Sequence, residues 1–242
     1  MEKKSEKLRL LLEEVDENKP VEQSLEEETV FEKHKRKRSV IVMFLAVSMF
    51  LLVLTGLALS AFSELFDEKR EDLIRGSRNV VKTSKLLIYA IQRQDLIEAE
   101  KLVEQIRQEI SALEKHVSGH SELRFSPAYK IAVQEFVEAM ALYYFIKEKK
   151  LVTSSELNVD AESYLLGICD LTGELVRKAV NSAISRSFAL AVEIKDFVSE
   201  IYGEMLKFNF RNGNLRKRFD SIKYNLKKLE DLVYDIKTKG LI

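Results

Sequence analysis

The feature that most constrains the fold of this chain is an uncharged, apolar segment of 25 residues, Ser39 to Ser63. As a helix this segment would be roughly 35 Å long, enough to cross the hydrocarbon core of a bilayer, which is about 30 Å thick. The charged leader before it, residues 1–38, is longer than that of a cleaved signal peptide. We therefore predict an uncleaved transmembrane helix, with a buried helix of a soluble protein as the alternative.

The leader, residues 1–38, consists largely of Glu and Lys. Its few apolar residues could form a short amphipathic helix, which Asn18, Lys19 and Pro20 would end. A segment this polar cannot bury enough apolar surface to offset the entropy of ordering it. We expect it to be a mobile tail.

The remainder of the chain, residues 64–242, predicts an all-α domain. The whole chain has two Pro and eight Gly, and helix-forming Leu, Glu, Lys and Ala are abundant. The one cysteine, Cys169, excludes an intramolecular disulfide and lies within an apolar stretch, so we expect it in the core. Apolar periodicity predicts helices at 64–92, 95–117, 128–146, 161–180, 187–208 and 215–237, with a capped turn near Thr153 to Glu156. These elements form a bundle of about six or seven helices.

Two of the predicted helices are apolar except for a few polar residues on one side. In the stretch 164–176 these are Asp170 and Glu174, and Gly167 leaves the same side open. In the stretch 128–146 they are Lys130, Gln134, Glu135 and Glu138. Carboxylates are seldom buried unless they are paired, hydrogen-bonded or bound to a metal ion. We predict that the two pairs of carboxylates face each other.

Four carboxylates without a histidine form a hard oxygen environment, which suits Mg²⁺ or Mn²⁺. The chain has three His, which argues against a His-based zinc or di-iron site. We hypothesise that Glu135, Glu138, Asp170 and Glu174 are metal ligands and catalytic groups that act on a phosphodiester. The alternatives are buried ion pairs, such as Arg177 with Glu174, and polar contacts between subunits.

A stripe of basic residues lies on one side of the predicted helix 64–92. Arg75, Arg78, Lys82 and Lys85 fall within about 80° of arc. The stripe is either a solvated helix face or a track for the phosphates of a nucleic acid. No aromatic residue interleaves these four cations, so stacking with bases is not expected. Net charge is not informative, because Lys plus Arg equals Asp plus Glu at 39 each.

Three stretches of the chain resemble the translin family. They are VQEFVEAMALYYFIKEKKLVT, YLLGICDLTGELVRKAVNS and NLRKRFDSIKYNLKKLEDLVYDIKTKG. The DLTGEL motif and the paired Glu are closer to translin-associated factor X, the catalytic branch, whereas the last stretch is closer to translin. The resemblance covers about 65–241 and implies the family's all-helical fold and its ring-like or barrel-shaped homo-oligomer. We interpret the chain as an archaeal-type member with an added amino-terminal anchor.

This resemblance also implies a function. The family includes metal-dependent endoribonucleases of single-stranded RNA and members that bind RNA or DNA without cutting it. The catalytic carboxylates of the factor X branch match Glu135, Glu138 and Asp170, and the next acidic position matches Glu174. Ser163 departs from the pattern, because many members have Asp there. The implied function is a Mg²⁺- or Mn²⁺-dependent endoribonuclease; a non-catalytic RNA- or DNA-binding protein and an extracytoplasmic helical scaffold stay open.

Basic residues flank the apolar segment 39–63 on both sides, so the positive-inside rule does not fix its orientation. We favour a single-pass protein of the cell membrane with a cytoplasmic domain, because the family's substrates are cytoplasmic. The family supplies no precedent for the anchor. A closed particle of eight subunits would carry eight anchors, which is geometrically awkward. We therefore expect a smaller assembly, as a homo-oligomer or with a second translin-like chain.

Overall fold

We analysed a computed structural model that describes residues 2–119 and 121–242, with side chains at 29, 31–119 and 122–242. In these residues the chain is helical apart from short connections, without a strand, which confirms the predicted all-α class. The chain divides into two compact units, Met1–Phe66 and Asp67–Ile242. Each unit is described by itself.

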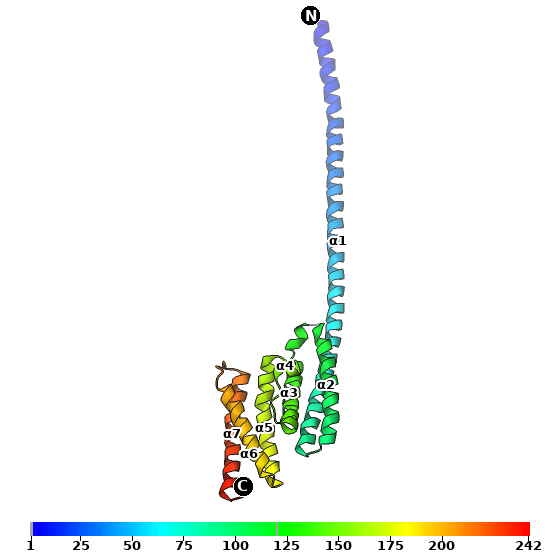
Figure 1. Cartoon of the computed structure of the whole chain (residues 1–242). Coiled ribbons are helices and arrows are strands. Elements are labelled where there is room, and N and C mark those ends of the chain that lie inside the picture. The colour runs from blue at the N-terminus through cyan, green and yellow to red at the C-terminus, as the bar shows by residue number, and fades with distance from the viewer. Residues whose placement is uncertain (1, 120) are drawn as a thin grey trace. The chain divides into compact units, whose positions relative to one another are not determined.

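The first unit consists of the amino-terminal part of helix α1, which spans Glu2–Gln92 (Figure 1). The helix continues through Asn18, Lys19 and Pro20, where we predicted an end. A proline inside a helix costs about 3 kcal/mol, but Glu17 and Lys19 before it and Glu22 and Gln23 after it are good helix formers. The mobility of residues 1–38 stays a prediction.

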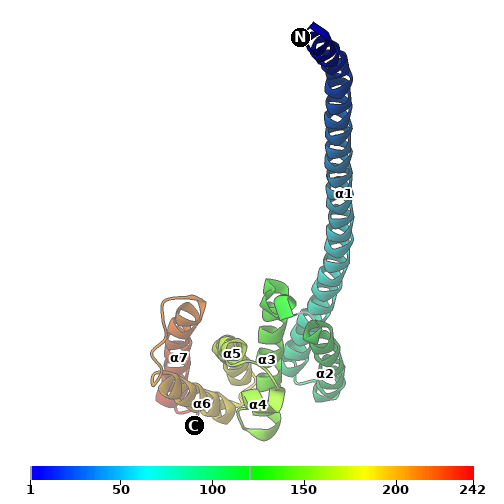
Figure 2. The ribbon, with the colours of Figure 1, turned by 90° about the horizontal axis from the view of Figure 1, so that it is seen from above.

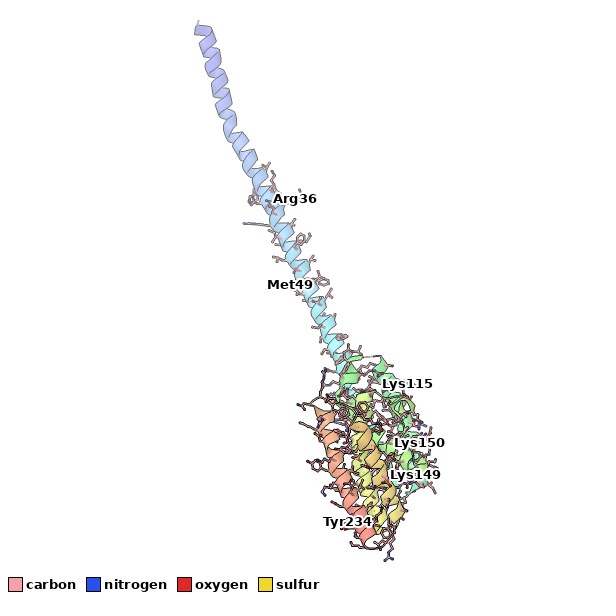
Figure 3. The ribbon with its side chains drawn as sticks, turned by 60° about the vertical axis from the view of Figure 1, so that its left-hand side comes forward. Arg36, Met49, Lys115, Lys149, Lys150 and Tyr234 are labelled. Carbon is pink, nitrogen blue, oxygen red and sulfur yellow. The ribbon has the colours of Figure 1, made fainter. Side chains whose placement is uncertain are left out.

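The apolar part of α1 presents its side chains to the surroundings on all sides. The large apolar side chains described between Val40 and Phe62 are exposed, and Met49 is 68% accessible (Figure 3). Within the described residues, one helix is long and apolar enough to cross a membrane, judged by length and composition alone.

The second unit contains the last part of α1 and six further α-helices. Their predicted positions agree with the structure to within a few residues. A short 3₁₀ helix, η1, lies between the predicted helices 95–117 and 128–146. The elements after α1 are α2 (Leu96–Ser118), η1 (Ser121–Phe125), α3 (Pro127–Glu148), α4 (Ser154–Leu157), α5 (Ala161–Ile184), α6 (Phe188–Met205) and α7 (Asn214–Thr238).

Local sequence determines where these helices begin. The carboxylate of Asp95 accepts a hydrogen bond from the backbone N–H of Glu98 and caps α2. Thr153 and Glu156 form the predicted capping box of α4. At the start of α5 the Asp160 carboxylate accepts a hydrogen bond from the backbone N–H of Ser163. The cap of α5 is therefore present although Ser163 replaces the family's aspartate.

Helix α5 is the centre of the domain. It packs along α3 on one side and along α7 on the other, while α6 contacts both α5 and α7 (Figures 1 and 2). The core between these helices is apolar and includes Cys169, as predicted; its largest fully buried side chains include Phe136, Phe145, Met140, Leu171 and Leu175. The row of helices α3, α5 and α7 positions the polar groups described below.

Gly167 determines how closely α3 approaches α5. A Cβ atom at this position would lie 2.7 Å from the Cβ atom of Val137 and 2.8 Å from the backbone oxygen of Gln134. Both distances are shorter than real Cβ contacts, so a side chain here would push the two helices apart. The predicted open side of α5 is therefore the surface against which the backbone of α3 packs.

We predict that Gly167→Ala destabilises the domain by about 1–3 kcal/mol, because an added methyl group in a tightly packed contact forces backbone movement. Gly203→Ala is the matched control, since a Cβ atom at that helical position in α6 meets no atom within 4 Å. There the better helix propensity of alanine should be neutral or stabilising by up to about 1 kcal/mol. Thermal unfolding measures both changes. Equal effects of the two substitutions would contradict the close approach.

Candidate metal and nucleic-acid site

Four carboxylates gather on the side of the domain where α3 and α5 are adjacent. Glu135 and Glu138 are three residues apart on α3, and Asp170 and Glu174 are four residues apart on α5. Each pair therefore lies one helical turn apart on a single face. The side chains of Glu135, Asp170 and Glu174 are 22%, 18% and 25% accessible, so all three are largely buried. The structure brings together the four carboxylates selected from the sequence.

Glu138 is surrounded by the other three carboxylates. Burial, followed by the negative charges of Asp170, Glu135 and Glu174, raises its pKa to about 8, while the positive charge of Arg218 acts in the opposite direction. Burial also raises the pKa of Glu135, while nearby Lys85 acts in the opposite direction. An ionised Glu138 is thus destabilised unless a positive charge comes close.

Two side chains hold Asp170 in place. The guanidinium of Arg218, on α7, forms an ion pair with one carboxylate oxygen, and the amide of Gln134 donates a hydrogen bond to the other. Arg218 was not among the site residues predicted from the sequence. The packing of α7 against α5 brings it to the carboxylates.

Glu174 is held by a separate group at the end of α1. The side-chain amide of Gln92 donates to both the backbone oxygen and a carboxylate oxygen of Glu174, each at 2.9 Å. Asn181 in turn donates to the side-chain oxygen of Gln92 at 3.3 Å. Arg177 lies 3.5 Å from the same carboxylate, which is the ion pair considered above as an alternative role for Glu174. This ion pair accounts for one of the four carboxylates, Glu174, and not for the other three.

The four side chains fit a hard divalent cation by their chemistry. All donors are carboxylate oxygens, as Mg²⁺ and Mn²⁺ prefer, and the raised pKa of Glu138 marks a place where a cation would stabilise the ionised form. In the described part of the chain, no three His, Cys, Asp or Glu side chains are already arranged around a common ion position. A cation here would share the two carboxylate oxygens of Asp170 with Arg218 and Gln134 or displace one of them.

The predicted basic stripe divides into two parts. Arg75, Arg78, Lys82 and Lys85 are all exposed on α1. Arg75 forms an ion pair with Asp72 at 2.7 Å, whereas the other three line a groove of about 830 Å³ between α1 and α3. The structure therefore brings three of the four cations to one groove and leaves Arg75 outside its lining.

The basic groove adjoins the carboxylates through Lys85. The ammonium nitrogen of Lys85 lies 3.6 Å from a carboxylate oxygen of Glu135. Tyr89, one turn further along α1, also lines the groove. No aromatic residue lies between the four cations, as predicted, but Tyr89 in the next turn of α1 extends the stripe, and the expectation of no base stacking did not take this residue into account.

A model of the Translin family matches residues 68–240, which lie within the second unit. Translin of Gallus gallus is 28% identical over 150 residues, covering 56% of this chain and 66% of that protein, just under two thirds of its length. Translin-associated protein X of Mus musculus is 26% identical over 228 residues, covering 76% of this chain and 79% of that protein.

Solved structures show the same fold. The crystal structure of apo-NeC3PO superposes with a TM-score of 0.69 at 30% identity and covers 73% of this chain and 94% of that one. AfC3PO, in a complex with duplex RNA, has a TM-score of 0.67 at 24% identity and covers 74% and 94%.

We predict that Glu138→Gln stabilises the protein near pH 8 and leaves its stability almost unchanged near pH 4.5. Folded Glu138 keeps its proton up to about pH 8, whereas the unfolded group ionises near 4.5. Between these values the folded state binds more protons, so the stability of the parent protein falls as pH rises, and the glutamine variant avoids this loss. Thermal unfolding with a chelator should show a gain of at least about 1 kcal/mol near pH 8.

The control for this measurement is Glu200→Gln, an exposed carboxylate on α6. Its stability should follow that of the parent protein at every pH. Parallel stability curves for the Glu138→Gln variant and the parent protein would show that Glu138 is not buried among like charges.

Proposed function

The chain belongs to the translin family, and from this membership and its site we propose that it binds single-stranded RNA and hydrolyses it as a metal-dependent endoribonuclease. One observation supports this most directly: four carboxylates gather beside a basic groove, and Lys85 contacts Glu135 where the two meet. The basic residues suit the phosphates of a strand, and the carboxylates suit the cation that such a hydrolysis needs. Single-stranded DNA would bind through the same phosphate contacts.

In this proposal Glu135, Glu138 and Asp170 hold Mg²⁺ or Mn²⁺, and Glu174 is either a further ligand or the group that orients the attacking water. When bound, such an ion polarises a phosphodiester and lowers the pKa of a coordinated water. Gln92 keeps the carboxylate of Glu174 in one orientation through its two hydrogen bonds. Fixed orientation of such groups is a main source of catalytic rate.

The cations around the site have separate tasks in this proposal. Arg78, Lys82 and Lys85 bind the phosphates of the strand along the groove. Arg218 is 45% exposed and lies against Asp170. If a metal ion displaced Arg218 from Asp170, the planar guanidinium of Arg218 would be free to bind the phosphate next to the bond that is cut. A guanidinium suits bidentate contact with phosphate oxygens.

The proposal is tested with the full-length chain in detergent and labelled single-stranded RNA, in the presence of Mg²⁺, Mn²⁺ or a chelator. We expect cleavage with either ion and none with chelator. Glu135→Gln and Asp170→Asn should each lower the cleavage rate more than about 100-fold, because loss of an outer-shell partner alone commonly costs 10–100-fold in activity. Glu200→Gln is the matched control and should cleave normally.

Binding of RNA should be largely retained in the two site variants, since the groove supplies the phosphate contacts. Cleavage that persists in Glu135→Gln or Asp170→Asn would contradict the assignment of the site. Duplex RNA belongs in the same experiment, because AfC3PO is described in complex with a duplex. A preference for the duplex would contradict the single-stranded substrate.

The second candidate function is nucleic-acid binding without hydrolysis. The specific observation in its favour is the ion pair of Arg218 with Asp170, which already satisfies one carboxylate without a metal ion. Binding of RNA without cleavage under any metal condition would support this function. Cleavage that requires a second translin-like chain would instead support a hetero-oligomeric enzyme. For the chain alone we propose a homo-oligomer.

We further propose that residues 39–63 anchor the protein in the cell membrane as a single-pass helix, with the helical domain in the cytoplasm. The exposed apolar surface of this part of α1 supports the proposal. An extracytoplasmic scaffold is the competing arrangement, and it could not meet cytoplasmic RNA.

We predict that the full-length chain stays with membranes during alkaline carbonate extraction, whereas a chain that begins at Asp67 is released, because only the former contains the apolar segment. In intact cells the helical domain should resist protease that is added from outside. Release of the full-length chain would contradict the anchor. Digestion of the domain from outside would contradict the cytoplasmic orientation.

A further inference from the structure

The groove beside the basic residues has an apolar floor as well as a cationic rim. Its apolar lining includes Val81, Leu86 and Ile131, from α1 and α3. Leu86 is 45% exposed and Ile131 is 52% exposed, although neighbouring residues on both helices are fully buried. Phosphate contacts alone would not need an apolar floor, so a ligand that fills this groove would need apolar surface of its own.

Tyr89 stands at the carboxylate end of the stripe. It follows Lys85 by one helical turn and lies on the same side of α1; its side chain lines the groove and is 50% exposed. The guanidinium carbon of Arg93 lies 4.6 Å from the centre of the Tyr89 ring. This cation–π contact restrains the ring on one face. We therefore expect a flat ligand to stack on the opposite face.

The charge of the groove argues against a second copy of this chain as its ligand. The residues that line the groove include three cations, Arg78, Lys82 and Lys85, and no acidic residue. An apolar contact between subunits would bury Arg78 and Lys82, which have no ion pair within the described residues, at a large desolvation cost. A ligand with flat apolar groups joined by negative charges matches both the floor and the rim.

We infer that this groove binds the unpaired bases of a single strand, with Tyr89 as a stacking platform and the phosphates on Arg78, Lys82 and Lys85. The inference rests on the proposed nucleic-acid binding and adds a base-binding subsite to it. A groove of about 830 Å³ lies in the size range of pockets that enclose small molecules, so it has room for individual bases. Because Lys85 lies 3.6 Å from Glu135, a base on Tyr89 is held close to the carboxylates.

The test separates bases from phosphates. The full-length chain in detergent, with chelator present to prevent cleavage, is titrated with a labelled oligouridylate and with an abasic strand of equal length. Affinities are measured by fluorescence anisotropy. For the parent protein, we expect clearly tighter binding of the strand that has bases.

Tyr89→Ala should weaken binding of the oligouridylate about tenfold, the effect expected for loss of one stacked base, and should leave binding of the abasic strand unchanged. Tyr89→Phe retains the ring and should bind like the parent protein. Tyr234→Ala removes another exposed tyrosine, on α7, and is the matched control (Figure 3). Lys82→Gln should weaken both strands alike, because it removes a phosphate contact.

Three results would overturn the inference. The first is equal binding of both strands by the parent protein, which would leave nucleic-acid binding intact and exclude only the subsite. The second is an equal loss for both strands in Tyr89→Ala, which would mean a structural role for the ring. The third is a change in the oligomeric state of Tyr89→Ala with no selective loss for the strand with bases, which would assign the groove to a subunit contact. If neither strand binds the parent protein, the proposed function itself fails.

Discussion

The close packing of α3 against α5 at Gly167 is the contact on which the candidate site depends. Without a side chain at this position, the backbone of α3 at Gln134 comes within van der Waals distance of α5. Glu135 follows Gln134 directly, and Asp170 lies one turn after Gly167. The same contact that completes the core therefore forces carboxylates from two helices to share one small region.

This arrangement is electrostatically unfavourable in the protein alone. Burial, together with the like charges around Glu138, raises its pKa to about 8. The cations nearby contact the other carboxylates: Lys85 at Glu135, Arg218 at Asp170 and Arg177 at Glu174. Groups with displaced pKa values cluster at functional sites more often than elsewhere. Stability alone would favour apolar residues at these buried positions, which is why we propose that the charges serve to hold a cation.

Much of the fold could be predicted from the sequence, because apolar periodicity and caps act locally. Asp95, the Thr153–Glu156 capping box and the apolar stripe of each helix fixed element positions to within a few residues. The predicted helix end at Pro20 was wrong, since tolerance of one lost hydrogen bond depends on the flanking residues. The facing carboxylates were also predictable, because charged residues in otherwise apolar helices must meet a partner.

The partners of the carboxylates could not be predicted in the same way. Arg218 lies among several cations on the polar side of α7, and only the packing of α7 on α5 selects it. Gln92 was the end of a predicted helix, without a hint that it would contact Glu174. Arg75 is separated from the groove by an ion pair with Asp72, three residues earlier, and this pair was visible in the sequence.

The most direct test of the account is to count the Mn²⁺ ions bound by the full-length chain, from the electron paramagnetic resonance signal of free Mn²⁺. The account predicts binding of one or two ions by the parent protein, and loss of this binding in both Glu135→Gln and Asp170→Asn. Glu200→Gln should bind as the parent protein does. Unchanged Mn²⁺ binding in both site variants, or no binding by a parent protein that nevertheless cuts RNA, would contradict a metal site at these carboxylates.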